Sequence, residues 1–179
     1  MILGFHFLAV LDDEYFKHNL YETAKLIDNK ADIIWYRFKN YKNLDEKLIT
    51  LRKIVSKSKL ILSSNYKLAV KYNFDGVHLN KQTIKDYTYI KNNTNLITGY
   101  SSHSPKEIDG ISADYYTLSP IYDTPKEYKV NPIGIVEYNK SKKVFALGGI
   151  NLDNLHTLKD NFYGFAGIRI VQDIINANF

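Results

Sequence analysis

Two apolar segments near the carboxyl end of the chain end in glycine, and their residue types are suited to binding an anion. The first reads LGGI, from Leu147 to Ile150, and the second reads GFAGIRI, from Gly164 to Ile170. Glycine lets the backbone approach an anion closely, and a helix that begins after such a turn offers free N–H groups and the positive end of its dipole. Two neighbouring turns of this kind predict a cradle for a phosphate group, and the alternative is that both are only tight turns.

Basic and hydroxyl-bearing residues follow the other apolar segments. Arg37 can hold phosphate oxygens with two parallel hydrogen bonds, and Lys39 and Lys126 would add point charges. If the segments are parallel strands of one barrel, all their carboxyl ends meet at one rim, where the site is expected. The other candidates that the pattern places at this rim are Ser63, Ser64, His78, Ser101, His103, Thr124, Gly148, Gly149, Gly167 and Arg169.

Each of the side chains also has a structural interpretation. Arg37 could donate to a structural salt bridge, and the two lysines could be ordinary solvated residues. His78 lies inside the apolar GVHL segment, which is typical of a core histidine, and His103 could simply begin a helix. Asp123 is the one acidic residue that the pattern places near the site, so carboxylates for a magnesium ion are scarce.

The elements that must position these residues are short strands alternating with amphipathic helical segments. Strands are predicted at 2–10, 32–37, 60–63, 76–78, 96–99, 115–118, 144–147 and 164–166. Helical patterns are predicted at 15–27, 44–55, 65–72, 81–91, 104–111, 152–158 and 170–175, and a long loop at 122–131. This alternation predicts the α/β class and a compact single-domain (β/α)8 TIM barrel over residues 1–179, smaller than the usual ~250 residues.

The composition excludes several classes of protein. The chain has 179 residues, 45% of them hydrophobic, and no cysteine, so neither disulfides nor thiolate sites are expected. No apolar run has membrane-spanning length, and the first residues read as a strand, so we expect a cytoplasmic protein without a membrane partner. The net charge of +5 is spread along the chain, so no nucleic-acid partner is predicted. A homo-oligomer is compatible with the sequence.

In the order and spacing of its motifs the chain resembles the thiamine-phosphate synthase/TenI superfamily, as a divergent member, over nearly its whole length. The motifs are WYRFK (35–39), FDGVHLN (74–80), GYSSHS (99–104), ADYYTLSPIYDTPK (113–126), VFALGGI (144–150) and GFAGIRI (164–170). The resemblance implies a barrel enzyme of thiamine biosynthesis. Such a transferase joins hydroxymethylpyrimidine pyrophosphate to thiazole phosphate, both phosphorylated small molecules, and releases pyrophosphate.

The resemblance also implies roles for particular residues. Arg37 and Lys39 would hold the pyrophosphate, and Ser101 would face the pyrimidine and the pyrophosphate. Lys126 would replace the pyrophosphate-binding lysine of the loop after strand 6, which makes these four the catalytic candidates. The expected contacts to the thiazole phosphate come from Thr124 and from the backbone N–H groups of Gly149, Gly167 and Ile168.

Several positions depart from the family pattern. Trp35 replaces a glutamine, and Arg169 replaces a common serine and either reaches the phosphate or points outward into a salt bridge. Ser63 and Ser64 stand where the synthase carries Asn-Asp, and Thr83 stands where it carries a second magnesium-binding aspartate. We therefore expect Trp35, Ser63 and Ser64 to bind substrate, and we expect no residue to be a metal ligand. No cofactor is predicted with certainty. Mg²⁺ that is recruited through the pyrophosphate is the one possible cofactor.

These departures leave three hypotheses. The first is a divergent synthase in which basic side chains partly replace magnesium. The second is a catalytically degenerate protein that binds a phosphate ligand without turnover. The third is a TenI-like thiazole tautomerase, which would have to act through His78 or His103, because Pro120 takes the place of the TenI histidine.

Overall fold

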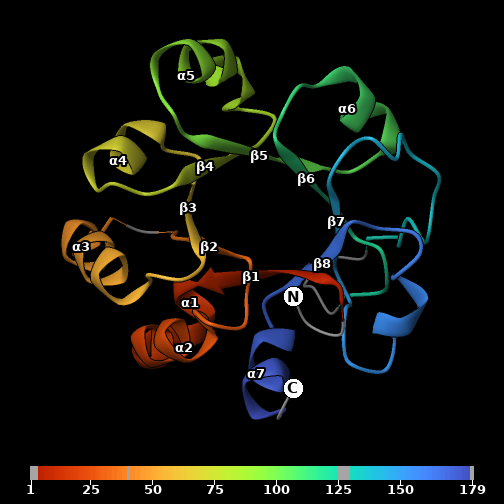
Figure 1. Cartoon of the computed structure of the whole chain (residues 1–179), viewed down its shortest axis with the longest axis horizontal. Helices are drawn as coiled ribbons and strands as arrows, with labels where there is room; N and C mark the ends of the chain where they lie inside the picture. The colour runs from red at the N-terminus through yellow and green to blue at the C-terminus, as the bar shows by residue number, and fades with distance from the viewer. Residues whose placement is uncertain (1–3, 40, 125–129, 178–179) are drawn as a thin grey trace.

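The chain forms a closed barrel of eight parallel strands in which β1 pairs with both β2 and β8 (Figure 1). This is a computed structural model, and it describes residues 4–39, 41–124 and 130–177. The strands are β1 (His6–Asp12), β2 (Ile33–Arg37), β3 (Lys59–Ser63), β4 (Gly76–Leu79), β5 (Ile97–Ser102), β6 (Tyr115–Leu118), β7 (Val144–Leu147) and β8 (Gly164–Gly167). The α/β barrel predicted from the alternation of segments is confirmed.

Short helices surround the barrel on its outside (Figure 1). The α-helices are α1 (Asp13–Phe16), α2 (Leu20–Ile27), α3 (Leu44–Ile54), α4 (Tyr66–Lys71), α5 (Tyr87–Asn93), α6 (Pro105–Gly110) and α7 (Ile170–Asn176). Three 3-10 helices, η1 (Lys17–Asn19), η2 (Ile84–Asp86) and η3 (Leu155–Thr157), complete the described helical segments. None of these helices is long and apolar enough to cross a membrane.

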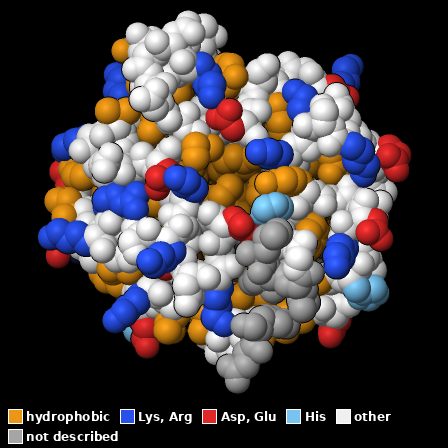
Figure 2. All heavy atoms as spheres, in the orientation of Figure 1, with side chains coloured by type: hydrophobic (Ala, Val, Ile, Leu, Met, Phe, Trp, Pro, Cys, Tyr) orange, Lys and Arg blue, Asp and Glu red, His pale blue; other side chains and the backbone are white. Residues whose placement is uncertain are grey.

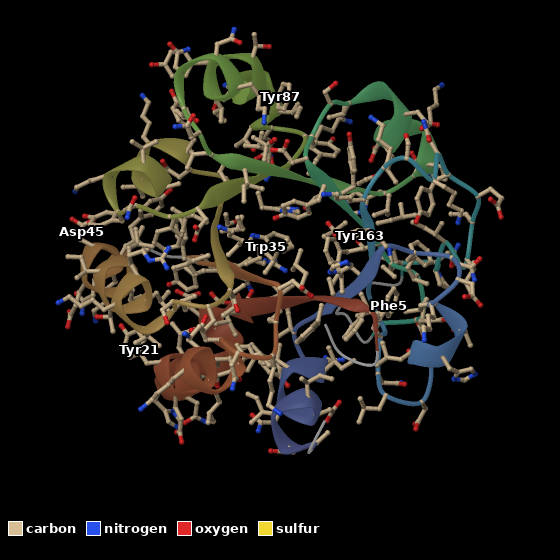
Figure 3. The ribbon with its side chains drawn as sticks, in the orientation of Figure 1. Phe5, Tyr21, Trp35, Asp45, Tyr87 and Tyr163 are labelled. Atoms are coloured by element: carbon tan, nitrogen blue, oxygen red, sulfur yellow. The ribbon has the colours of Figure 1, made fainter. Side chains whose placement is uncertain are left out.

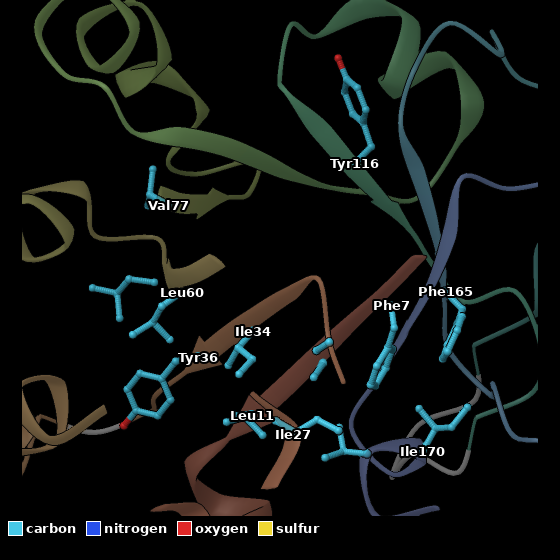
Figure 4. Close-up of a cluster of buried hydrophobic side chains, with 14 of the residues drawn as sticks. Phe7, Leu11, Ile27, Ile34, Tyr36, Leu60, Val77, Tyr116, Phe165 and Ile170 are labelled. Atoms are coloured by element: carbon cyan, nitrogen blue, oxygen red, sulfur yellow. The ribbon is translucent and has the colours of Figure 1, made fainter. Parts of the chain in front are cut away.

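Alternate residues of each strand face opposite sides of the sheet, and this separates two apolar clusters. Side chains such as Phe7, Leu11, Ile34 and Phe165 point outward and pack under the helices (Figure 4). The residues between them fill the barrel interior, where the cluster consists of Leu8, Val10, Trp35, Ile61, Tyr115, Phe145 and Ala166. Strands β1, β2, β3, β6, β7 and β8 contribute to both clusters, so the register of these strands cannot shift without exposing one of the two layers.

Two predicted helices take a different form in the structure. The pattern at 15–27 is divided into α1, η1 and α2, and Lys17 at the break has a φ of +47°. The pattern at 152–158 yields only turns and η3. No α-helix therefore begins directly after Gly149, and the cradle expected there has backbone turns in place of a helix N-terminus. Apolar spacing alone does not distinguish one turn of 3-10 helix from an α-helix.

Basic side chains are scattered over the face that Figure 2 shows, where they alternate with acidic and uncharged groups around an apolar centre. Several lysines are paired with nearby carboxylates, such as Lys47 with Asp13 at 3.0 Å and Lys91 with Asp114 at 3.1 Å. Many basic groups of the described surface are thus offset locally by carboxylates, and those that Figure 2 shows are dispersed.

Gly99 in β5 faces the barrel interior at a position with no room for a side chain. A Cβ atom at this position would overlap the ring of Tyr115 and the Nδ1 atom of His78. Gly110 in α6 differs, because a Cβ atom there would have no neighbour within 4 Å. Substituting alanine at each of the two glycines therefore distinguishes steric crowding from the general effect of adding a methyl group.

We predict that Gly99→Ala lowers the free energy of unfolding by about 1–3 kcal/mol, because the interior must shift to admit the methyl group. Gly110→Ala should change it by less than about 1 kcal/mol. Urea denaturation of both variants measures the difference. Equal effects at the two positions would contradict this account of the interior.

Candidate functional site

A cavity of about 780 Å³, here called the rim cavity, lies at the carboxyl ends of the strands. Its walls come from β1, β2, β7 and β8 and from the segments that follow β1, β2, β6, β7 and β8. The lining residues are Asp12, Glu14, Tyr15, Arg37, Lys39, Asp123, Thr124, Leu147, Gly148, Gly149, Ile150, Asn151, Ala166, Gly167, Ile168, Arg169 and Asp173. This is the end at which a parallel barrel builds its binding site.

The rim cavity brings together much of the site that the sequence predicts. It contains Arg37, which ends β2, and Lys39, which lies two residues later, together with the glycine turns that follow β7 and end β8. The predicted site residues found there are Arg37, Lys39, Thr124, Gly148, Gly149, Gly167, Ile168 and Arg169. Lys126 lies outside the described residues.

The turn after β7 requires glycine at both of its positions. Gly148 has a φ of +96° and Gly149 a φ of +67°, in the left-handed region that side chains disfavour. A Cβ atom at Gly149 would overlap the carbonyl oxygen of Asp123, and one at Gly148 would lie 2.8 Å from the Cα atom of Pro120. The turn therefore presents bare backbone to the cavity and packs tightly against the segment after β6.

Carboxylates accompany both basic residues at the carboxyl end of β2. The Oδ2 atom of Asp12 lies 3.8 Å from Nε of Arg37, and Lys39 donates through Nζ to Oε2 of Glu14. This hydrogen bond from Lys39 to Glu14 raises the pKa of Lys39. Asp12 is buried and also caps α1, since its Oδ1 atom accepts from the N–H groups of Glu14 and Tyr15. The acidic partners therefore hold the two cations at the rim.

Sequence patterns do not predict these two carboxylates at the site, where Asp123 is the only acidic residue expected. The sequence predicts that the first strand ends at Val10, two residues before Asp12 and four residues before Glu14. The strand in fact ends at Asp12. Moving the strand end by two residues brings both carboxylates to the rim, so the error in the boundary caused the omission.

Arg169 is exposed at the rim cavity, where it precedes α7. Among the described residues its guanidinium forms no salt bridge, so the alternative of a structural ion pair has no partner there. Its five N–H donors are accordingly available to an anion in the cavity.

His78 and Trp35 lie beneath the rim, inside the ring of strands, where Figure 3 shows Trp35 at the centre of the barrel. The two rings stack with centroids 3.8 Å apart, and the Arg37 guanidinium lies 5.5 Å from the Trp35 ring. Burial, with a smaller contribution from the positive charge of Arg37, lowers the pKa of His78 to about 3. His78 is therefore neutral at physiological pH, as expected of a core histidine.

Ser101 and His103 line a second, smaller cavity of about 310 Å³, here called the serine cavity. Its other lining residues are Asn80, Lys81, Gln82, Tyr100 and Glu107. The His103 ring contacts the carbonyl oxygen of Ser119 through Nδ1 at 2.8 Å. Ser101 and His103 are thus separated from the predicted site residues that line the rim cavity.

Ser63 and Ser64 lie at the end of β3 and line neither of these two cavities. Asn80 donates through Nδ2 to Oγ of Ser64 at 3.3 Å, and Thr83 donates to Oδ1 of Asn80 at 3.2 Å. These neutral groups do not match the carboxylates that Mg²⁺ normally takes from a protein. Within the described residues no group of three or more His, Asp or Glu side chains could hold a metal ion.

Comparison of the sequence with known proteins identifies the family to which the chain is similar. The family model described as thiamine monophosphate synthase matches residues 7–174. A protein of Aquifex aeolicus (strain VF5), named "Putative thiamine-phosphate synthase 2", is 31% identical over 176 residues, which cover 89% of this chain and 94% of that protein. The thiamine-phosphate synthase of Prochlorococcus marinus (strain AS9601) is 28% identical over 95% of this chain, which spans only 51% of that longer protein.

A solved structure supports the fold independently. The thiamine phosphate pyrophosphorylase of Pyrococcus furiosus superposes with a TM-score of 0.73 at 22% sequence identity, and the match covers 95% of this chain and 96% of that one. At this identity the likeness concerns the barrel itself.

The pairing of Lys39 with Glu14 gives a first prediction about the rim cavity. Glu14→Gln removes a carboxylate that competes with an anion for Lys39, so the affinity for inorganic pyrophosphate should rise about two- to fivefold at low salt. Isothermal calorimetry measures it. Glu46→Gln, which removes the same charge from the exposed side of α3, is the matched control and should leave the affinity unchanged. An equal gain in both variants would indicate only a general effect of net charge.

Proposed function

The chain belongs to the thiamine monophosphate synthase family, and on that premise we propose that it is a thiamine-phosphate synthase. In this proposal it joins hydroxymethylpyrimidine pyrophosphate to thiazole phosphate and releases pyrophosphate. The substrates are therefore phosphorylated small molecules, and the rim cavity is where their charged groups bind.

The observation that carries this proposal is the grouping of Arg37, Lys39 and Arg169 with the glycine turns around one cavity. Cations and bare backbone are complementary to phosphate, because guanidinium binds two oxygens at once and glycine allows close approach. A cavity of about 780 Å³ falls in the range of small-molecule sites.

The proposed chemistry places the pyrophosphate against Arg37 and Lys39. The bond from the pyrimidine methylene carbon to the pyrophosphate oxygen breaks first, and the leaving group takes the electron pair. Arg37 and Lys39 stabilise the charge that develops on that oxygen, with Lys126 assigned to the same task by the family resemblance. The thiazole nitrogen then attacks the cationic carbon and completes the new carbon–nitrogen bond.

The thiazole phosphate is assigned to the opposite wall of the same cavity. Gly149, Gly167 and Ile168 would offer backbone N–H groups, and Thr124 a hydroxyl that here donates to the carbonyl of Tyr122 at 3.2 Å. Arg169 would add a guanidinium to this phosphate. No step is assigned to Mg²⁺, because Ser63, Ser64 and Thr83 supply only neutral oxygens.

A second candidate is a protein that binds a phosphate ligand without turnover. The pairing of Arg37 with Asp12 and of Lys39 with Glu14 favours it, because part of the positive charge available to a leaving group is already offset. Under the tautomerase hypothesis, His103 is the better candidate for the acid/base, because His78 is fully buried and has a low pKa. His103 lines the serine cavity and could meet a ligand directly.

The synthase proposal is tested by measuring thiamine phosphate formation from the two substrates. Arg37→Gln should lower kcat roughly a hundredfold, because one group that stabilises the leaving oxygen is lost. Lys53→Gln removes one positive charge from the exposed surface of α3 and should retain full activity. Binding of thiazole phosphate without any product, even at high enzyme concentration, would exclude the synthase and support the binding protein.

A further inference from the structure

A chain of hydrogen bonds connects the barrel interior to the serine cavity. The Tyr115 hydroxyl lies 3.0 Å from Nδ1 of His78, and Nε2 of the same ring lies 3.0 Å from Oγ of Ser101. Tyr115 and His78 are buried, whereas Ser101 is partly exposed and lines the serine cavity. The three residues come from β6, β4 and β5, which are adjacent strands. We call them the Tyr–His–Ser relay.

The direction of these bonds follows from the Tyr115 hydroxyl. Among the described residues His78 is its only hydrogen-bond partner. If the proton between them were on His78, the hydrogen of the buried phenol would have no acceptor, which costs about 1–3 kcal/mol. A phenol that donates to Nδ1 avoids this cost. The neutral imidazole then carries its single proton on Nε2.

An Nε2–H group can only donate, so Ser101 must accept from it. The oxygen of Thr117 also lies near Nε2, but at 3.5 Å it is a weaker acceptor than Ser101 at 3.0 Å. A serine hydroxyl that accepts one hydrogen bond keeps its own hydrogen for another partner. That hydrogen is directed away from the ring, on the side where the serine cavity lies.

We propose that Tyr115 and His78 are positioning residues that make Ser101 a dedicated hydrogen-bond donor toward the serine cavity. Ser101 in this role binds an uncharged acceptor atom, an unprotonated ring nitrogen of the ligand. It does not act as a nucleophile, because His78 offers no free lone pair to take its proton. The ligand assignment rests on the proposed function, in which the pyrimidine ring of hydroxymethylpyrimidine pyrophosphate carries such nitrogens.

The surrounding packing holds the relay in one geometry. Trp35 stacks on one face of the His78 ring with an interplanar angle of 27°, and Gly99 leaves just enough room beside Nδ1. The lowered pKa of His78 keeps the ring neutral, so a second proton on Nδ1 does not reverse the bond from Tyr115. The His78 ring therefore has one orientation and one protonation state. Such a ring can orient the Ser101 hydroxyl, which would otherwise rotate freely.

The tautomer of His78 is directly measurable in the intact protein. We would label all histidines with ¹⁵N and record long-range ¹H–¹⁵N correlations at neutral pH, with His78→Gln to assign the signal. The wild-type ring should show a protonated Nε2 and an unprotonated Nδ1. Tyr115→Phe, which removes the donor to Nδ1, should move the ring toward the Nδ1–H form. A wild-type ring already in the Nδ1–H form would overturn the proposal.

Tyr116→Phe is the matched control, because it removes the same hydroxyl from the next residue of β6. Tyr116 faces out of the barrel, where its hydroxyl donates to the carbonyl of Ile111. This variant should keep the wild-type tautomer of His78. A tautomer that changes equally in both variants would contradict a relay specific to Tyr115.

A second measurement addresses the ligand. Calorimetry with hydroxymethylpyrimidine pyrophosphate should show an affinity about three- to tenfold lower in Ser101→Ala and in Tyr115→Phe, the value of one hydrogen bond. The double variant should be no weaker than the weaker single variant, because both changes remove the same donor. Unchanged affinity in both single variants would overturn the ligand assignment. A wild-type protein that does not bind this ligand would refute the proposed function, and the tautomer would still decide the relay.

Discussion

Each strand of a closed parallel barrel is hydrogen-bonded on both sides, so no strand can slide without breaking two ladders at once. In this chain the constraint is severe, because most strands are only four or five residues long and each supplies side chains to the interior and to the outer layer. A residue at the end of one strand is therefore fixed relative to residues far away in sequence. Arg37 and Gly167 line one cavity for this reason.

The same constraint decides what a polar residue can do inside the barrel. His78 is enclosed by Trp35, Tyr115 and the neighbouring strands, so water cannot satisfy its nitrogens. Both nitrogens find partners in adjacent strands, and the buried ring becomes part of the support for the rim. Ser101 at the rim is partly exposed, whereas His78 and Tyr115, which orient it in the proposal, are buried. In this proposal, the binding and the positioning groups lie at different depths along the barrel axis.

Sequence patterns predicted the strands well, because short β-branched and aromatic runs bounded by polar residues leave little choice. They predicted the glycine turns and the basic residues after β2 for the same reason, since each follows a strand end directly. What they could not give was the direction of side chains in three dimensions. The pairing of Glu14 with Lys39 depends on the contact of β1 with β2, and no local pattern encodes it. The substitution of turns and η3 for the helix after Gly149 likewise reflects packing and not apolar spacing.

The turn after β7 and the segment after β6 form one continuous piece of structure. Ile121 and Tyr122 donate their N–H groups to the carbonyls of Leu147 and Gly148, at 2.9 and 3.0 Å, so pairing continues past the end of β6. Gly149 then packs directly on the backbone of Asp123. The two loops are therefore interlocked parts, and neither can be exchanged alone. A designer who transplants the β6 loop of a homologous barrel into this scaffold would have to transplant the double-glycine turn with it.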